Sequence, residues 1–286
     1  MARPRILVTG ATGFIGKSLI KALVASGDYQ IYAVSRKKQT FEKAVNWILG
    51  DLRSFEFCRT LGEQSFQKIV HLGWEGLPNR TFENSCINLY NTVNLLTNLS
   101  NNKETDVVLI GSCLEYGDFN SLVSDFTTPR GYDHFAQSKI LIHEFARLKE
   151  LKYKWVRPFY LYGSGQSSKS LIPALLDSHN RNERIEIKRP ESAHDFIHIE
   201  DFVSALILIL SSETEMRVFN VGTGVLTSVG EIANKIGEIF AKPLLFPANS
   251  ISGLLAKSES ARLLGWNPNY VGIAGISRWL HQEVGS

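Results

Sequence analysis

Cysteine is scarce in this chain of 286 residues, which carries only Cys58, Cys86 and Cys113. The three cysteines show no CxxC or other metal-ligand spacing, and an odd number argues against a framework of disulfides. The sequence therefore predicts neither a metal site nor a small secreted domain held by disulfides. A reducing compartment fits best, so we expect a cytoplasmic location.

Long runs of one charge and long apolar runs are also missing. The 31 basic and 28 acidic residues give a formal net charge of +3 and form no block of either sign, so no nucleic-acid partner is indicated. Glycines interrupt the apolar run within residues 1–27 and no membrane-length stretch follows, so we expect no membrane partner. The composition, with 44% hydrophobic residues, is typical of globular proteins with one large domain or a large and a small one.

The first thirty residues predict a strand, a tight turn and a helix. RILVTG (5–10) is a short apolar run, and GKSLIKALVASG (16–27) has apolar residues at helical spacing. The glycine spacing in GATGFIG lets the backbone turn sharply and lets a pyrophosphate approach the helix N-terminus, although tight turns also use glycine for structural reasons alone. The residues expected to bind a dinucleotide here are Gly10, Thr12, Gly13, Phe14, Ile15 and Gly16.

An acidic residue is absent where a dinucleotide fingerprint carries one. QIYAVSR (30–36) is typical of a second strand, and about twenty residues after the turn it offers Ser35 and Arg36, followed by Lys37. A carboxylate would repel an adenosine 2′-phosphate, whereas a hydroxyl and a guanidinium bind it. The segment therefore predicts NADP(H) rather than NAD(H), unless these basic residues only form a solvated loop.

Further motifs follow in order along the chain. They include GDL (50–52), HLGW (71–74), Asn88 in a helical segment, VRPFYLYG (156–163), DFIHIEDFVSAL (195–206), FNVGTG (219–224) and LGWNPNY (264–270). With the glycine turn, they resemble the extended short-chain dehydrogenase/reductases, the family of nucleotide-sugar epimerases, dehydratases and ketoreductases. The resemblance implies further cofactor contacts at Asp51, Leu52, Leu72, Gly73 and Trp74.

The same resemblance implies the fold. We expect an α/β protein with a Rossmann-type doubly wound parallel sheet and a small C-terminal α/β lobe that binds the substrate. Residues 1–165 should form mainly the NADP(H)-binding domain and residues 166–286 mainly the lobe, with about 195–222 returning to the first domain. A homodimer through paired helices is also implied.

The chemistry is expected at the end of one strand and on one helix. VVLIGSCLEYG (107–117) indicates a buried strand that delivers Ser112 to its C-terminal end, where ligands of doubly wound sheets bind. By the resemblance, Ser112 is catalytic and hydrogen-bonds the sugar oxygen. In the helical segment 133–148, Phe135 and Lys139 lie four residues apart on one face.

Phe135 departs from the family pattern, which has a tyrosine at this position. The family's lysine holds the nicotinamide ribose and lowers the pKa of the phenol, and the phenol exchanges a proton with the substrate oxygen. Phenylalanine keeps the ring and lacks that proton. Neither Tyr132, about two helical turns before Lys139, nor Tyr116 in the serine motif, nor His134 on another side of the helix is a convincing substitute.

The segments HLGWEGLPN, GSCLEYG and PFYLYGSGQ look closest to reductases of nucleotide-linked 4-keto-6-deoxy sugars, such as 6-deoxytalose-forming reductases. Substrate contacts are expected at Trp74, Ser112, Tyr116 and Tyr160. We therefore expect NADPH-dependent reduction of a 4-keto group, weakened by a deliberate Tyr→Phe change at position 135. The alternatives are a nucleotide-sugar 4-epimerase, which would retain NAD, and a naturally inactive NADP(H)-binding regulator.

Overall fold

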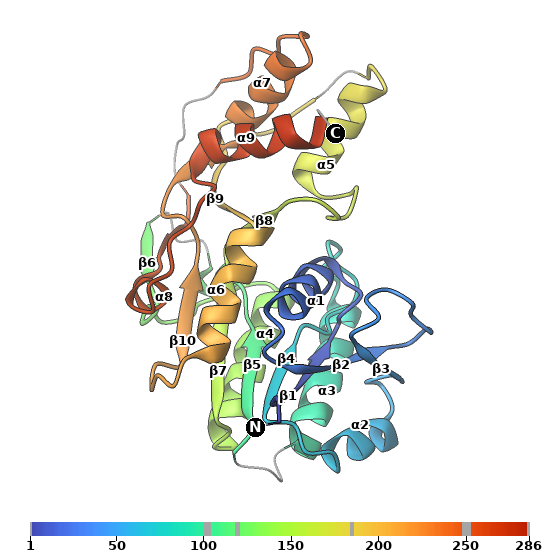
Figure 1. Ribbon diagram of the computed structural model, residues 1–286. Helices are drawn as coiled ribbons and strands as arrows, with labels where there is room; N and C mark the ends of the chain where they lie inside the picture. Colours follow the sequence, from blue (N-terminus) through green and yellow to red (C-terminus); the bar gives the residue numbers. More distant parts are fainter. Residues whose placement is uncertain (1, 100–103, 118–120, 184–185, 248–252, 285–286) are drawn as a thin grey trace.

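The computed structural model describes residues 2–99, 104–117, 121–183, 186–247 and 253–284. At its centre lies a parallel sheet in the order β10-β7-β5-β4-β1-β2-β3 (Figure 1). Its strands are β1 (Arg5–Thr9), β2 (Gln30–Ser35), β3 (Asn46–Leu49), β4 (Lys68–His71), β5 (Asp106–Ile110), β7 (Tyr153–Pro158) and β10 (Val218–Val221). The strand order reverses between β1 and β4, which confirms the predicted doubly wound sheet.

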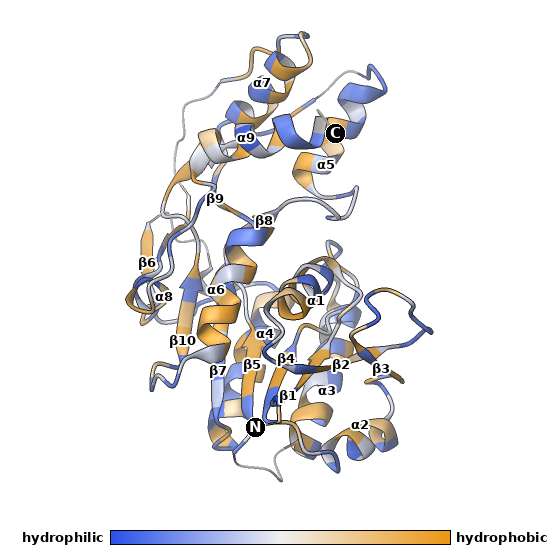
Figure 2. Cartoon of the chain, in the orientation of Figure 1, coloured by the Kyte–Doolittle hydropathy of each residue, from blue (hydrophilic) through white to orange (hydrophobic). Residues whose placement is uncertain are grey.

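Helices cover both faces of this sheet because its strands are apolar on both sides. In β1, Ile6 and Val8 pack in the cluster that includes α1 (Phe14–Ser26) and α6 (Ile199–Ser211). Leu7, between them, points to the other face, as alternation along a strand requires. That face is covered by α2 (Phe55–Gly62), α3 (Phe82–Leu99) and α4 (His134–Leu148). Figure 2 shows hydrophobic residues concentrated on the central strands and along α6.

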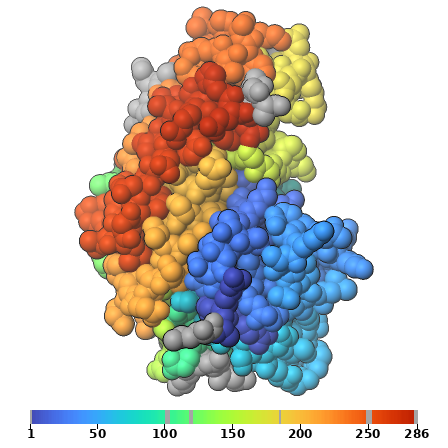
Figure 3. Space-filling model, in the orientation of Figure 1, coloured from blue at the N-terminus to red at the C-terminus, as the bar shows by residue number. Residues whose placement is uncertain are grey.

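The second lobe contains a smaller three-stranded sheet in the order β11-β9-β8. It consists of β8 (Tyr160–Tyr162), β9 (Ala193–His198) and β11 (Leu226–Ser228), and its helices are α5 (Leu171–Asn180), α7 (Val229–Ile239) and α9 (Gly272–Val284). Its core includes Tyr162, Phe196 and Ile232. Between these lobe segments the chain forms α6, which packs on the larger sheet, and β10, which is an edge strand of that sheet. Figure 3 shows the two parts side by side, with the N-terminal part in blue and the C-terminal part in orange and red.

A buried aspartate in β9 binds the segment that follows β10 and a residue of a further short strand. Asp195 accepts hydrogen bonds from the backbone N–H groups of Thr223 and Gly224, each at 2.8 Å, and of Ala256 at 3.0 Å. Burial raises the pKa of this carboxyl, and the hydrogen bonds oppose that rise. The remaining short elements are η1 (Cys113–Tyr116), β6 (Leu122–Ser124), β12 (Leu255–Lys257) and α8 (Glu259–Leu263).

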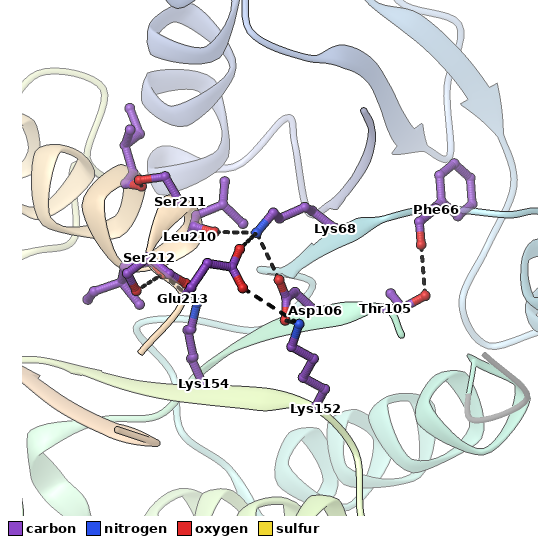
Figure 4. A network of polar contacts seen from close by, with 12 residues as sticks. Phe66, Lys68, Thr105, Asp106, Lys152, Lys154, Leu210, Ser211, Ser212 and Glu213 are labelled. Carbon is purple, nitrogen blue, oxygen red and sulfur yellow. Dashed lines mark hydrogen bonds and ion pairs between the residues drawn. The ribbon is translucent and has the colours of Figure 1, made fainter. Parts of the chain in front are cut away.

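Lysines tie the C-terminal end of α6 to the N-terminal ends of β4, β5 and β7. Lys68 Nζ lies 2.8 Å from Asp106 Oδ2 and donates to the Leu210 carbonyl at 2.9 Å, and Lys154 Nζ donates to the Ile209 carbonyl at 2.9 Å (Figure 4). The last carbonyls of a helix have no partner within the helix, and cations near them are stabilising. The network therefore fixes α6 on the sheet. None of the helices within the described ranges combines the length and apolarity needed to span a bilayer.

Candidate active site

The glycine turn is packed as tightly as its spacing predicts. Gly10 has φ 65°, and a Cβ added to it would lie 2.6 Å from the backbone carbonyl carbon of Leu72. A Cβ on Gly16 would lie 2.2 Å from the Gly10 carbonyl oxygen. Gly13 is the N-cap of α1, and no side chain caps that end of the helix. Backbone N–H groups at the start of α1 therefore face the end of the sheet, where an anion is stabilised.

A cavity of about 350 Å³ lies beside this turn. Several predicted cofactor residues line it, namely Gly10, Thr12, Gly13, Ser35, Arg36, Asp51, Leu52, Leu72, Gly73 and Trp74. Lys37 does not line it; the Lys37 side chain is exposed, and its carbonyl accepts a hydrogen bond from Ser35 Oγ at 2.7 Å. Arg53, which donates to Asp51, holds the pKa of that carboxyl below its usual range.

A larger cavity of about 630 Å³ continues from the turn toward the second lobe. Leu72, Gly73 and Trp74 line both cavities, so the two spaces meet along the end of β4. The structure brings to the larger one the predicted residues Phe14, Ile15, Gly16, Ser112, Phe135, Lys139 and Tyr160. One continuous site therefore runs from the end of β2 to the start of the lobe.

Ser112 follows β5 and caps the short helix η1. Its Oγ accepts from the Leu114 N–H at 3.2 Å, and its own N–H donates to Glu115 Oε1 at 2.7 Å. Glu115 is fully buried and forms an ion pair with Arg157 Nε at 2.8 Å. These two charged residues hold the backbone that carries Ser112. Sequence reasoning missed them, although a Glu inside the serine motif and an Arg in the apolar strand segment VRPFYLYG were visible signals.

Lys139 and Phe135 both face the larger cavity from the first two turns of α4, whose N-cap is Asp133. Lys139 Nζ donates to the Ile110 carbonyl at 2.8 Å and lies 3.7 Å from the centre of the Trp74 ring. Burial lowers the pKa of Lys139 to about 7. The Phe135 ring meets Trp74 edge-to-face, with ring centres 5.2 Å apart. An aromatic ring thus occupies the position expected for the phenol, without a proton to transfer.

Three other side chains do not replace that proton donor. Tyr132 precedes α4 rather than lying on it and is 74% exposed. His134 packs on Phe82, with ring centres 5.0 Å apart. Tyr116 was expected to contact the substrate, but its fully buried hydroxyl lies 2.7 Å from Asn220 Oδ1, and the residue lines neither cavity. Its ring turns away from the site because its hydroxyl completes a buried polar network.

Other residues at the site were not predicted. Arg80 lines the larger cavity, pairs with Asp133 Oδ2 at 3.0 Å, and places its guanidinium carbon 5.9 Å from the Phe135 ring centre. Gln166 and Ser167 line the same cavity from the segment between β8 and α5. No pattern in the sequence pointed to them, because loops that follow different strands meet only in the fold. Within the described ranges, no three His, Cys, Asp or Glu side chains are grouped as metal ligands.

The chain is similar to known proteins in sequence and in fold. Residues 6–222 match the family described as the NAD dependent epimerase/dehydratase family. The chain is 28% identical to GDP-6-deoxy-D-talose 4-dehydrogenase of Aggregatibacter actinomycetemcomitans, over 82% of this chain and 80% of that protein. It is 26% identical to dTDP-4-dehydro-6-deoxyglucose reductase of Escherichia coli, over 96% and 95%. The solved structure of MoeE5 with UDP-glucuronic acid and NAD is similar with a TM-score of 0.83 and 26% identity, covering 98% of this chain and 99% of that one.

Proposed function

The chain belongs to the NAD dependent epimerase/dehydratase family, and from that premise we propose that it is an NADPH-dependent reductase of the 4-keto group of a nucleotide-activated 4-keto-6-deoxy sugar. Because Phe135 stands in place of the tyrosine, we expect the enzyme to reduce its substrate slowly. One observation carries the proposal: Ser112, Lys139 and the glycine turn line the same cavity. Relatives named as a 4-dehydrogenase and a 4-dehydro-6-deoxyglucose reductase support the choice of reaction.

The glycine turn fits a dinucleotide. Neither Gly10 nor Gly16 has room for a side chain, and the uncapped start of α1 lies at the shared edge of the two cavities. A pyrophosphate needs such a close approach to backbone N–H groups. Bound there, a reduced pyridine dinucleotide would supply hydride to the keto carbon. NADP(H) is favoured because Ser35 and Arg36 stand where a carboxylate would repel a 2′-phosphate.

Each predicted catalytic residue then has a defined task. Ser112 Oγ hydrogen-bonds the sugar oxygen from the end of β5. Lys139 holds the nicotinamide ribose, and its place beside Trp74 keeps it away from bulk water. Phe135 orients the site by packing and moves no proton. Proton transfer by a positioned side chain contributes about a hundredfold to ten-thousandfold in rate, so reduction should be slower by that factor.

The second candidate is a non-catalytic NADP(H)-binding protein, and Phe135 is the observation that favours it. Binding of dinucleotide requires the glycine turn, Arg36 and Lys139, and none of these depends on a phenol at position 135. A cavity that keeps its cofactor residues but lacks the proton donor suits a protein that senses the dinucleotide. The two candidates differ in whether tyrosine at position 135 restores turnover.

Phe135→Tyr is therefore the decisive variant. We expect NADPH oxidation with one of a panel of dTDP-, CDP-, GDP- and UDP-linked 4-keto sugars to rise about a hundredfold or more. Phe145→Tyr, the same change farther along α4 at a position that does not line the larger cavity, is the matched control and should leave the rate unchanged.

Three outcomes would go against the proposed reductase. An inactive Phe135→Tyr protein that still binds NADPH would support the non-catalytic candidate. Interconversion of sugars with tightly retained NAD and no net cofactor consumption would identify a 4-epimerase. If calorimetry detects no binding of either NADPH or NADH, the dinucleotide site itself is refuted.

A homodimer and a cytoplasmic location complete the proposal. Large apolar side chains are exposed on the neighbouring helices α3 and α4, among them Ile87 (45%), Tyr90 (60%) and Leu141 (53%). A second copy of the chain would cover them. The free cysteines Cys58, Cys86 and Cys113 suit a reducing compartment. Light scattering during size-exclusion chromatography gives the mass, and Tyr90→Lys should shift a dimer toward the monomer.

A further inference from the structure

An ion pair lines the smaller cavity, beside the glycine turn. Arg36 follows β2 and Glu75 lies in the loop after β4, and these two strands flank β1 in the sheet. Arg36 Nη1 lies 2.8 Å from Glu75 Oε1, and both residues line the cavity. The pair therefore reaches across the end of the strand that leads into the glycine turn.

The backbone of Glu75 is held by partly buried hydrogen bonds, whereas its carboxylate is open to water. The Glu75 N–H donates to Asn88 Oδ1 at 2.8 Å, and Asn88 Nδ2 donates to the Glu75 carbonyl at 3.0 Å. Asn88 is only 2% exposed, so it is a rigid anchor on α3. By contrast, the side chains of Arg36 and Glu75 are 54% and 41% exposed. An ion pair so open to water is weak and can be exchanged for another partner.

Glu75 forms the ion pair with Arg36, and Asp51 also attracts Arg36 electrostatically. Asp51, the other carboxylate that lines this cavity, is held by Arg53, with Arg53 Nη2 at 2.6 Å from Asp51 Oδ2. Arg36 therefore relies on Glu75 as its ion-pair partner. Loss of the Glu75 charge would leave Arg36 without its ion-pair partner at the position proposed for the adenosine ribose.

We propose that Glu75 is a cofactor-specificity residue whose carboxylate competes with an adenosine 2′-phosphate for Arg36, so that the chain accepts NAD(H) alongside NADP(H). The inference rests on the proposed dinucleotide site. To bind the 2′-phosphate, Arg36 must release Glu75, and the freed carboxylate then remains beside a group of like charge. The 2′-hydroxyl of NAD(H) requires no such exchange. Glu75 thus opposes NADP(H) selectively, although Ser35 and Arg36 favour it.

The test is Glu75→Gln, which preserves the backbone contacts to Asn88 and removes the charge. Dissociation constants for NADPH and NADH are measured on the full chain by fluorescence titration. We expect the constant for NADPH to fall about threefold to tenfold and that for NADH to change by less than about twofold. Glu63→Gln is the matched control, because Glu63, at the C-terminal end of α2, forms an exposed ion pair with Arg59 at 2.6 Å outside both cavities.

A second measurement isolates the adenosine end of the cofactor. Adenosine 2′,5′-bisphosphate and adenosine 5′-monophosphate replace the dinucleotides, and only the bisphosphate should bind more tightly to Glu75→Gln. In an Arg36→Gln background most of that gain should disappear, because the competition is for Arg36. The inference is overturned if Glu75→Gln leaves the NADPH to NADH ratio unchanged or weakens NADPH. If the unaltered chain binds neither dinucleotide, the proposed dinucleotide site is refuted, and the inference about Glu75 with it.

Discussion

Replacing Glu115 by glutamine should destabilise the protein far more than a single neutralised charge on its surface. Glu115 is 0% exposed, and its carboxylate accepts from the Ser112 N–H at 2.7 Å, Trp155 Nε1 at 3.1 Å and Arg157 Nε at 2.8 Å. Glutamine has the same shape and keeps one acceptor oxygen. In either orientation its NH₂ group would face a donor, the Arg157 Nε–H or the Ser112 N–H.

The size of the effect follows from what Glu115→Gln leaves behind. Arg157 is 1% exposed and would remain in the core as a cation without its counter-charge. Removing one partner of a buried pair costs about 3–5 kcal/mol, whereas a typical folded domain is stable by only about 5–15 kcal/mol. An exposed pair such as Arg59–Glu63, with side chains 50% and 60% exposed, contributes far less, because water screens its charges.

Urea unfolding followed by circular dichroism measures the difference in free energy. Glu115→Gln should lower the free energy of unfolding by about 3 kcal/mol or more, and Glu63→Gln by less than about 1 kcal/mol. The double variant Glu115→Leu with Arg157→Met should recover part of the loss, because it leaves no unpaired charge. A Glu115→Gln protein within about 1 kcal/mol of the original would refute the reasoning.

Two further variants probe buried lysines. Lys139→Met should raise the free energy of unfolding by about 1–3 kcal/mol at pH 7 or below, where burial penalises the charged amine. The gain should fade as the pH rises from about 7, the pKa of Lys139 in the folded protein, toward 10.5, its pKa in the unfolded chain. Thermal unfolding at several pH values measures this dependence. Burial also lowers the pKa of Lys154, but its amine donates to two carbonyls at the end of α6, whereas Lys139 donates to one. Lys154→Met should therefore cost about 1–3 kcal/mol in urea unfolding, and the half-exposed Lys152→Met less than about 1 kcal/mol.

The periodicity of the sequence was sufficient to predict those parts of the site that a single segment of the chain forms by itself. The apolar run before Gly10 and the helical spacing after Gly16 predict β1 and α1, and both are present. The four-residue spacing of Phe135 and Lys139 places them together on α4, facing one cavity. In such cases the physics is local, because a helical or extended backbone alone decides which side chains share a face.

Contacts between distant segments could not be read in the same way. Tyr116 sits in a motif typical of the substrate site, yet its hydroxyl bonds to Asn220, 104 residues away, and the ring is buried. Arg36 and Glu75 are 39 residues apart and meet because β2 and β4 flank the same strand. Both contacts depend on the strand order of the sheet, which no local sequence pattern encodes.

The combination of Phe135 with Lys139 bears on why the tyrosine is missing. A lysine at 7% exposure with its pKa lowered to about 7 opposes folding at neutral pH, and its hydrogen bond to the Ile110 carbonyl offsets only part of that cost. Methionine would fill the same space without a charge to desolvate. A chain that no longer binds a ligand through Lys139 gains stability by losing it. Lys139 beside Phe135 therefore favours either a dinucleotide site still in use or a tyrosine replaced alone, over gradual decay of the whole site.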